Sequence, residues 1–480
     1  MESKTINVSQ HLLEELLDVE KVKFCYECGI CTASCPMVEL IPQHYHPRSL
    51  LQKIFLDLNR ILKEEEPWLC AWCYRCYRRC PQRLKLPEIF LVMKDLAAER
   101  GHLQGFRKAL ETIKKEIPLP AVCSWVCFHP ERGEVEKPQV VSALRHFLTD
   151  YKLEEKASPM PKTHTEKIAI IGSGPAGLTA ACELVKNGYS VTVFESSSEP
   201  GGMLRRCMPE YRLPRDVLDI EIEHIKGLGV EIRTNTTIGK DLTLNTLSRD
   251  GYKVVFVAIG AHESRKLGIK GEELKGVIHA LNFLNEANLG KDIKLGDRVA
   301  VIGGGNVAMD AARTALLLGA KEVSILYRRS GEEMPANPCE VKEAEDSGVK
   351  IDFLIAPKKI LGKNGQVAAL ECARMELGEF DESGRRRPIP IEGSEFTMEL
   401  DTIILAIGET PDLSLLPKEV EVSERNTIVV DPLNMETTQK GVFAGGDVVL
   451  GPATVIEAIV TGKKAAAAID RYLRRRRKDG

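Results

Sequence analysis

The sequence predicts an α/β protein with two Rossmann-like dinucleotide-binding domains, the second inserted in the first, preceded by a mainly helical domain. The main observation is a strand, a glycine-rich turn, a helix and a second strand, which occur in this order at 167–195 and again at 298–329. Before this repeat, apolar residues recur three and four positions apart, as in amphipathic helices, in the segments 11–19, 48–62 and 86–100.

A polar segment at 154–167, EEKASPMPKTHTEK, separates the helical part from the α/β part and has the composition of a linker. We therefore expect a helical domain at 1–155. The first dinucleotide-binding domain is expected at 156–295 and, after the insertion, again at 409–480, with the second domain at 296–408.

Composition excludes several classes of protein. The 480 residues include 66 Lys and Arg against 69 Asp and Glu, a balance that gives no reason to expect nucleic-acid binding. There is no run of 18 apolar residues, so no membrane span is expected. The start, MESKTINVSQ, has no signal-peptide pattern, and we expect a cytoplasmic protein.

Ten of the 14 cysteines lie between Cys25 and Cys127, and eight of these form two runs of identical spacing, C-x2-C-x2-C-x3-C-P. This is the bacterial ferredoxin run, in which three cysteines bind one [4Fe–4S] cluster and the fourth binds the other cluster. Zinc binding is the alternative, but a zinc site needs four ligands, whereas these two runs provide eight cysteines at regular spacing. The predicted ligand sets are Cys25, Cys28, Cys31 and Cys80 for one cluster, and Cys70, Cys73, Cys76 and Cys35 for the other.

Two further features near these runs stay open. Cys123 and Cys127 either contribute to a third cluster or are partly buried without a redox role. The basic and aromatic residues from Tyr74 to Lys85 either dock an acidic redox partner or form a solvated face that offsets the negative charge of a cluster.

The first glycine-rich turn predicts an FAD site. It reads Gly172-x-Gly174-Pro175-Ala176-Gly177 between a strand and a helix, and the helix N-terminus would face the pyrophosphate. Glu195 ends the following strand, where a carboxylate accepts a ribose hydroxyl.

The C-terminal part is predicted to complete this FAD site. Gly446 and Asp447 follow a short strand, and such an aspartate binds the ribityl–phosphate arm of the flavin in two-dinucleotide-domain flavoproteins. A helix that begins near Ala453, with Thr454 and Glu457 in its first turn, would direct its positive end at the isoalloxazine ring.

The second glycine-rich turn predicts the nicotinamide dinucleotide site, with Gly303, Gly305, Asn306, Val307 and Ala308 as candidate contacts. The following strand ends in Arg328 and Arg329 instead of an acid. Because guanidinium groups suit a 2′-phosphate, the sequence favours NADPH over NADH. The alternative is that both arginines are solvated at the end of a strand.

Residues 121–475 resemble the small-subunit family of NADPH-dependent glutamate synthase, on the motifs GSGPAGL, EPGGMLRR, PEYRLP, GGGNVAMDAAR, AIGETPD and FAGGD. This resemblance implies that Gly202, Met203, Arg205 and Arg212 also contact FAD. The chain departs from the family in its two regular ferredoxin runs, and in having Glu131 where the family tends to have a further cysteine.

These motifs together predict an oxidoreductase subunit. A hydride passes between NADPH and FAD, and single electrons pass through two [4Fe–4S] clusters to or from a partner. The expected partner is a redox protein or a catalytic subunit in a hetero-oligomeric complex, and a ferredoxin is an alternative.

The rival interpretations are the small subunit of glutamate synthase and the NADP-binding component of an electron-bifurcating complex. A disulfide reductase is a third, but the second dinucleotide-binding domain contains only the isolated Cys339 and Cys372, without a CxxC pair.

Overall fold

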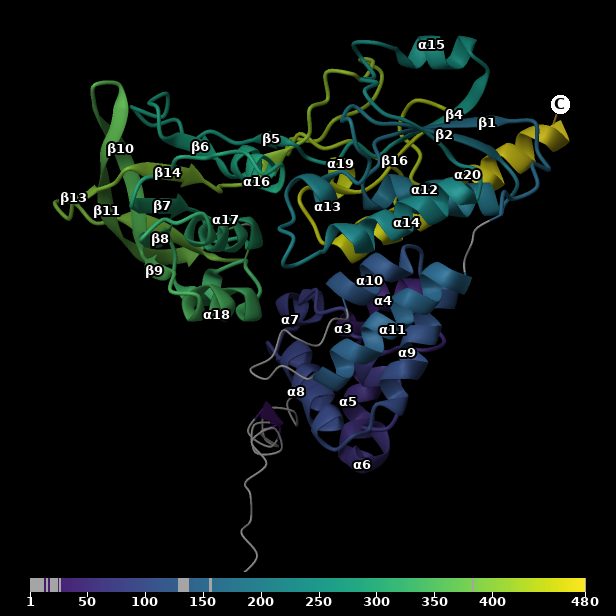
Figure 1. The fold of residues 1–480 in the computed structure, drawn as a ribbon, viewed down its shortest axis with the longest axis horizontal. Coiled ribbons are helices and arrows are strands. Elements are labelled where there is room, and N and C mark those ends of the chain that lie inside the picture. Colours follow the sequence, from purple (N-terminus) through teal and green to yellow (C-terminus); the bar gives the residue numbers. More distant parts are fainter. Residues whose placement is uncertain are drawn as a thin grey trace, which may run out of the picture. The chain divides into compact units, whose positions relative to one another are not determined.

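The computed structural model describes Leu13, Leu16, Leu17, Cys25 and the ranges 27–127, 138–154, 158–381 and 384–479. These residues form two units, each compact by itself (Figure 1). The first unit comprises the described residues within Met1–Gly202, Leu213–Ile259 and Ser414–Gly480, and the second comprises those within Met203–Arg212 and Gly260–Leu413. The second unit therefore interrupts the first, which confirms the predicted insertion.

The N-terminal part of the first unit is helical. Its buried core includes Trp68, Phe90 and Phe106, and the Trp68 and Phe106 ring centroids lie 4.8 Å apart. Prolines stand in the first turn of several helices, where the missing N–H costs no hydrogen bond. The elements are α3 (Ile30–Ala33), α4 (Pro36–Leu40), α5 (Pro47–Leu56), α6 (Leu58–Ile61), η1 (Glu66–Leu69), α7 (Arg75–Arg79), α8 (Leu86–Glu99), α9 (Gln104–Glu116), α10 (Pro120–Val126) and α11 (Pro138–Glu154).

The helix predicted at 86–100 is confirmed by α8, whereas the segment 48–62 forms two helices. Asp57 separates them, and its carboxylate accepts a hydrogen bond from the Arg60 N–H at 3.0 Å, which caps α6. The helix predicted at 11–19 lies outside the described residues, apart from Leu13, Leu16 and Leu17.

The α/β part of the first unit is a parallel sheet with the strand order β16-β4-β1-β2-β3. β16 comes from the C-terminal part of the chain and pairs with β4 through Val442 and Val255. Helices α12 and α20 pack against each other in this unit. The elements are β1 (Lys167–Ile171), α12 (Pro175–Lys186), β2 (Ser190–Phe194), α14 (Arg215–Gly227), β3 (Glu231–Arg233), α15 (Leu244–Arg249), β4 (Tyr252–Val257), β16 (Val442–Ala444), α19 (Asp447–Leu450) and α20 (Val455–Asp479).

The second unit contains another parallel sheet, ordered β6-β14-β7-β8-β9, and an antiparallel sheet of β10 to β13 that was not predicted. The unit begins at Gly260 rather than at the predicted residue 296, because β6 pairs with β14 and completes the parallel sheet. Its elements are α13 (Met203–Arg206), β5 (Glu263–Ser264), β6 (Val277–His279), α16 (Ala280–Asn288), β7 (Arg298–Ile302), α17 (Asn306–Leu317), β8 (Glu322–Tyr327), η3 (Gly331–Glu333), α18 (Pro338–Asp346), β9 (Lys350–Phe353), β10 (Ile355–Lys363), β11 (Gln366–Phe380), β12 (Arg386–Pro390), β13 (Phe396–Glu399), β14 (Thr402–Leu405) and β15 (Glu409–Thr410).

Among the described residues, no helix combines the length and the apolar character that crossing a bilayer requires.

Candidate functional site: two cysteine loops and two dinucleotide turns

The two cysteine runs fold in the same way. In the first run, Glu27 and Gly29 on either side of Cys28 have φ values of 51° and 74°. In the second run, Trp72 and Tyr74 on either side of Cys73 have φ values of 51° and 55°. A left-handed backbone at a bulky residue is strained, and such strain persists where a site requires it. Its repetition at matching positions indicates that both loops are shaped for the same kind of ligand.

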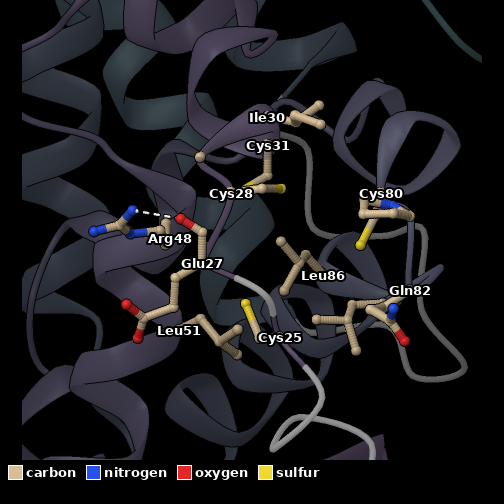
Figure 2. A pocket seen from close by; sticks show the side chains of 13 residues that line it. Cys25, Glu27, Cys28, Ile30, Cys31, Arg48, Leu51, Cys80, Gln82 and Leu86 are labelled. Atoms are coloured by element: carbon tan, nitrogen blue, oxygen red, sulfur yellow. Dashed lines mark hydrogen bonds between the residues drawn. The ribbon is translucent and has the colours of Figure 1, made fainter.

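The first predicted ligand set surrounds one pocket. Cys25, Cys28, Cys31 and Cys80 line it together, although Cys80 comes from the end of the second run (Figure 2). The Arg48 guanidinium donates a hydrogen bond to the Glu27 carbonyl at 3.0 Å and so supports the strained loop beside Cys28. Cys28 is exposed and the other three thiols are half-buried, so this pocket faces solvent.

The second predicted ligand set is less exposed. Cys35, Cys70 and Cys76 are buried and Cys73 is half-buried. Burial raises the pKa of Cys35 to about 12, and the nearby Cys70 and Cys31 thiols add to the shift. Burial also raises the pKa of Cys76, together with Cys70, Cys73 and Cys35. Cys35 and Cys76 ionise reluctantly by themselves and lie close to Cys70. Such a group of thiols suits a cluster, because iron supplies the positive charge that holds the ligands as thiolates.

Among the described residues, no three His, Cys, Asp or Glu side chains are placed to share one metal ion. Ligands of a cubane cluster each bind a different iron, so they surround the cluster instead of meeting at one point. The four cysteines around the pocket in Figure 2 have this arrangement.

A buried lysine beside the second ligand set was not anticipated. Lys94 of α8 is 3% exposed, donates a hydrogen bond to the Cys70 carbonyl at 2.9 Å and lies 5.3 Å from the Trp72 ring centroid. It lies four residues after Phe90 and three before Ala97, on the buried face of the helix. The sequence signal that could have identified Lys94 is a lysine at a position where the helical periodicity of this segment calls for an apolar residue. Its charge would offset the negative charge of a cluster bound by Cys70.

The first dinucleotide turn has the space that a bound pyrophosphate needs. A Cβ at Gly172, whose φ is 100°, would lie 2.5 Å from the Ala258 carbonyl oxygen, and a Cβ at Gly177 would lie 2.0 Å from the Gly172 oxygen. These two glycines permit close backbone packing. A Cβ at Gly174 would meet nothing within 4 Å, so this glycine keeps the approach to the helix N-terminus open. Pro175 and Ala176 begin α12 at this point.

Glu195 lies directly beside this turn. Its carboxylate accepts hydrogen bonds from the Ser173 N–H at 3.0 Å, the Ser173 hydroxyl at 2.5 Å and the Ser197 N–H at 2.8 Å. Gly202 also approaches the turn, since a Cβ on it would lie 2.7 Å from the Gly174 Cα. The carboxylate is thus fixed next to the place where a dinucleotide ribose would lie.

The C-terminal residues of the predicted FAD site lie in the same unit. A Cβ at Gly446 would lie 3.0 Å from the Ala176 Cβ, and one at Gly462 of α20 would lie 2.4 Å from the Ala176 oxygen. Asp447 begins α19. The structure therefore brings the two ends of the predicted FAD site together at the start of α12.

Thr454 and Glu457 form a reciprocal cap at the start of α20. The Thr454 N–H and hydroxyl donate to the Glu457 carboxylate at 3.0 and 2.7 Å, and the Glu457 N–H donates to the Thr454 hydroxyl at 3.4 Å. The other carboxylate oxygen of Glu457 pairs with the Arg75 guanidinium at 2.5 Å. Glu457, predicted as an FAD contact, is thus bonded to the second cysteine loop.

The second dinucleotide turn repeats the features of the first. A Cβ at Gly303, whose φ is 146°, would lie 2.1 Å from the Ala406 oxygen, whereas a Cβ at Gly305 would meet nothing within 4 Å. The Asn306 side-chain oxygen accepts from the Asn337 N–H at 2.8 Å. Val307 is half-buried and Ala308 is buried against the core of this unit. The turn is therefore open at the same position as the FAD turn.

The two predicted NADPH arginines have different surroundings. Arg328 is exposed, whereas Arg329 is 5% exposed, pairs with Asp381 at 2.7 Å and donates to the Arg386 carbonyl at 2.7 Å. Although Arg328 is exposed as a residue, the protein atoms around its guanidinium, together with the neighbouring Arg329 and Arg385, lower the pKa of this group. Arg385, from the turn after β11, was not predicted. Three guanidinium groups that repel one another form a local positive field that an anion would relieve.

The residues that the resemblance adds to the FAD site divide between the units. Gly202 belongs to the first unit, and Met203, Arg205 and Arg212 belong to the second. The Arg212 side chain is only 12% exposed and pairs with Asp310 at 2.6 Å and Glu340 at 2.8 Å. Burial holds the pKa of Asp310 above its usual range even beside this arginine. The FAD contacts of Met203, Arg205 and Arg212 stay predictions.

The remaining cysteines are buried or half-buried. Cys123 and Cys127 lie one helical turn apart at the end of α10, and their mutual hydrogen bond and burial raise the pKa of Cys123. Cys182 is buried in α12. Cys207 is buried in the second unit, and its thiol lies 3.6 Å from the Leu281 carbonyl oxygen.

The fold and the site define a flavoprotein of the two-dinucleotide type that carries a two-cluster iron–sulfur domain. The family of pyridine nucleotide-disulphide oxidoreductases matches residues 166–462, and the 4Fe-4S dicluster domain matches residues 21–84. The chain belongs to the pyridine nucleotide-disulphide oxidoreductase family and is an NAD(P)H-dependent oxidoreductase. The predicted fold class and the predicted cofactors, FAD, NADPH and two [4Fe–4S] clusters, are confirmed by these matches.

Curated relatives agree with this assignment. The NADP(+)-dependent formate dehydrogenase subunit beta of Moorella thermoacetica is 43% identical over 83% of this chain and 60% of its own length. The NADPH-Fe(3+) oxidoreductase subunit beta of Geobacter sulfurreducens is 39% identical over 83% of this chain and 63% of its own length. The chain thus spans less than two thirds of these two relatives. The glutamate synthase [NADPH] small chain of Escherichia coli is 34% identical over 86% of this chain and 90% of its own length, which confirms the resemblance.

Solved structures confirm the fold alone. FprA from Mycobacterium tuberculosis in complex with NADPH has a TM-score of 0.57 and 21% identity, and the match covers 66% of this chain and 86% of FprA. Several relatives are named as subunits or chains of larger enzymes, which supports the presence of a partner subunit in general terms.

Proposed function

We propose that this chain moves a hydride between NADPH and FAD, and single electrons between FAD and a catalytic partner subunit through the two clusters. The observation that carries this proposal is the placement of both cysteine loops and the FAD turn in one unit, with Arg75 of the second loop bonded to Glu457 of the predicted flavin site. FAD supplies the conversion between hydride and single-electron transfer.

The residues of this chain would act by binding and orientation. The open glycines Gly174 and Gly305 admit the two pyrophosphates, and Glu195 holds a ribose. Arg328 and Arg385 would bind the 2′-phosphate. Arg329 would not contact it directly, because its guanidinium is already paired with Asp381. No protein nucleophile is needed for hydride transfer between two cofactors.

The partner is proposed from the names of relatives. The 43% and 39% identical proteins are subunits of an NADP-dependent formate dehydrogenase and of an NADPH-Fe(3+) oxidoreductase, and a ferredoxin is the alternative partner. The rival function as glutamate synthase small subunit differs in the partner. The rival function as the NADP-binding component of a bifurcating complex differs also in the flavin, which would divide an electron pair between a high-potential and a low-potential acceptor. We place the protein in the cytoplasm, where a reducing environment keeps cluster thiols from forming disulfides.

A disulfide reductase is the candidate from another class, because thioredoxin reductases share the fold. The second unit contains Cys207, Cys339 and Cys372, which are far apart in the sequence and do not form a CxxC pair. Electron transfer through the clusters is therefore the better-supported function.

The test is anaerobic mixing of the purified chain with NADPH, followed by flavin absorbance and by electron paramagnetic resonance (EPR) of the clusters. We expect the flavin band to bleach, cluster signals to appear, and the acceptor dye dichlorophenolindophenol to be reduced without any partner. Bleaching of the flavin without reduction of either cluster would contradict the proposal. Turnover of a disulfide substrate at a rate comparable with dye reduction would favour the reductase.

A further inference from the structure

We propose that the cluster bound by Cys35, Cys70, Cys73 and Cys76 is the one that exchanges electrons with the flavin, and that Arg75 positions it for this role. The cluster bound by Cys25, Cys28, Cys31 and Cys80 then exchanges electrons with the partner. This order rests on the proposed function and adds the sequence in which the two clusters act.

The first argument is the Arg75–Glu457 ion pair. Arg75 lies between the ligands Cys73 and Cys76, and its guanidinium reaches the carboxylate that also caps α20. The Arg75 and Glu457 side chains are 31% and 16% exposed, so the pair is only partly screened by water. One carboxylate thus connects the second cysteine loop to the helix end that is predicted to face the flavin.

The second argument is an independent contact between the same ligand set and the same helix. Cys35 is the N-cap residue of α4, and Glu39 of α4 pairs with Lys464 of α20. Helices α4 and α20 pack against each other. Both chain segments that supply this ligand set, the start of α4 and the loop from Cys70 to Cys76, are therefore attached to α20.

The third argument is exposure. The ligand set attached to α20 has three buried thiols, whereas the other set has one exposed and three half-buried thiols around an open pocket (Figure 2). A cluster at the solvent-facing pocket is accessible to a partner protein. A cluster among buried thiols is suited to electron transfer within the chain.

The electron balance follows from this order. NADPH delivers two electrons to FAD as a hydride, and each cluster accepts one electron at a time. Each oxidation of the flavin by one electron reduces the cluster near α20 by one electron. That cluster is reoxidised when it reduces the solvent-facing cluster, which is reoxidised by the partner.

Cysteine variants test the order by EPR of rapidly frozen samples. In Cys28→Ser, the remaining cluster should still be reduced after NADPH is mixed with the protein. In Cys73→Ser, the remaining solvent-facing cluster should be reduced by dithionite, but its fast reduction by NADPH should be lost. Fast reduction by NADPH in Cys73→Ser, together with its loss in Cys28→Ser, would reverse the order and overturn the proposal.

Arginine variants test the positioning role in a protein that retains all eight ligands. Arg75→Gln should shift the midpoint potential of the buried cluster to a lower value, because a nearby positive charge is removed and Glu457 loses its partner. Arg79→Gln is the matched control, since it removes an exposed charge from the same helix, and Arg75→Lys should restore most of the potential. Equal shifts in Arg75→Gln and Arg79→Gln would refute the role of Arg75.

Flavin absorbance separates this proposal from the proposed function. If NADPH fails to bleach the flavin in the unmodified protein, the proposed function fails. If the flavin bleaches in every variant but the clusters are reduced in the other order, only the further inference fails.

Discussion

The preference for NADPH should depend on Arg328 far more than on Arg329. Arg328 is exposed at the end of β8 beside Arg385, whereas Arg329 is already paired with Asp381 and bonded to the Arg386 carbonyl. The informative perturbations are therefore Arg328→Gln and Arg329→Gln in separate proteins. Each removes one guanidinium and keeps a polar side chain of similar reach.

The size of the effect follows from the contact that each change removes. A hydrogen bond between a guanidinium and a phosphate contributes about 1.5–3 kcal/mol, which at about 1.4 kcal/mol per decade is roughly 10- to 150-fold in affinity. Arg328→Gln should raise KM for NADPH by about this factor and leave KM for NADH nearly unchanged. kcat should fall less, because the 2′-phosphate contributes binding that is equal in the ground state and the transition state.

Arg329→Gln should act mainly on stability. It removes the charged hydrogen bonds from the buried Arg329 guanidinium to Asp381 and to the Arg386 carbonyl, and one such bond contributes about 1.5–3 kcal/mol. Thermal unfolding should therefore occur at a lower temperature, with a smaller and less selective change in KM.

The assay is steady-state reduction of the dye dichlorophenolindophenol with each nicotinamide, together with a thermal unfolding curve for each variant. Arg387→Gln is the matched control, because Arg387 is an exposed arginine on β12. Equal increases in KM for NADPH and NADH in Arg328→Gln would refute the 2′-phosphate contact. So would an unchanged KM for NADPH.

Four other predictions concern the clusters and the buried charges. Anaerobically purified protein should contain about eight iron atoms per FAD, and a value near four by metal analysis would contradict two clusters. Cys35→Ser should remove the EPR signal of the buried cluster and spare the other, whereas selective loss of the solvent-facing cluster would show that the ligand sets are wrong. Lys94→Met should lower the midpoint potential of the buried cluster, because a buried positive charge beside Cys70 is removed; an unchanged potential would contradict this. Arg212→Met should destabilise the second unit by about 3–5 kcal/mol in chemical denaturation, because Asp310 and Glu340 are left buried without their cation. Loss of FAD at unchanged stability would instead indicate that Arg212 acts in the flavin site.

The parts of the fold that could be predicted are those specified by short-range sequence spacing. The turns at Gly172 and Gly303 need glycine because a Cβ would collide with the backbone just after a neighbouring strand, and this requirement is visible as a motif. The two cysteine runs are equally local. Helix α8 follows from its apolar period, whereas the break between α5 and α6 depends on the single capping residue Asp57.

The antiparallel sheet of β10 to β13 could not be predicted in the same way. Its longest strand, β11, shows no regular alternation of buried and exposed positions, and the register of the sheet depends on pairing between distant segments, such as Leu370 with Met398. The start of the second unit at Gly260 depends in turn on the pairing of β6 with β14. Neither pairing leaves a motif in the sequence.

The ion-pair partners of the charged residues in the candidate site could not be predicted from the sequence. Motifs identified Arg75, Arg212 and Arg329 as basic residues near cofactor sites, but the partners of all three are distant in the sequence. Arg75 bonds to a residue 382 positions away, Arg212 to one 98 positions away and Arg329 to one 52 positions away. A paired guanidinium is compensated by its carboxylate and has less charge to offer a cofactor than an unpaired one. The sequence therefore identifies the candidate cations, but the long-range ion pairs determine which of them can bind a phosphate. Arg328 is the best candidate at the predicted NADPH site, because the neighbouring Arg329 is already paired with Asp381.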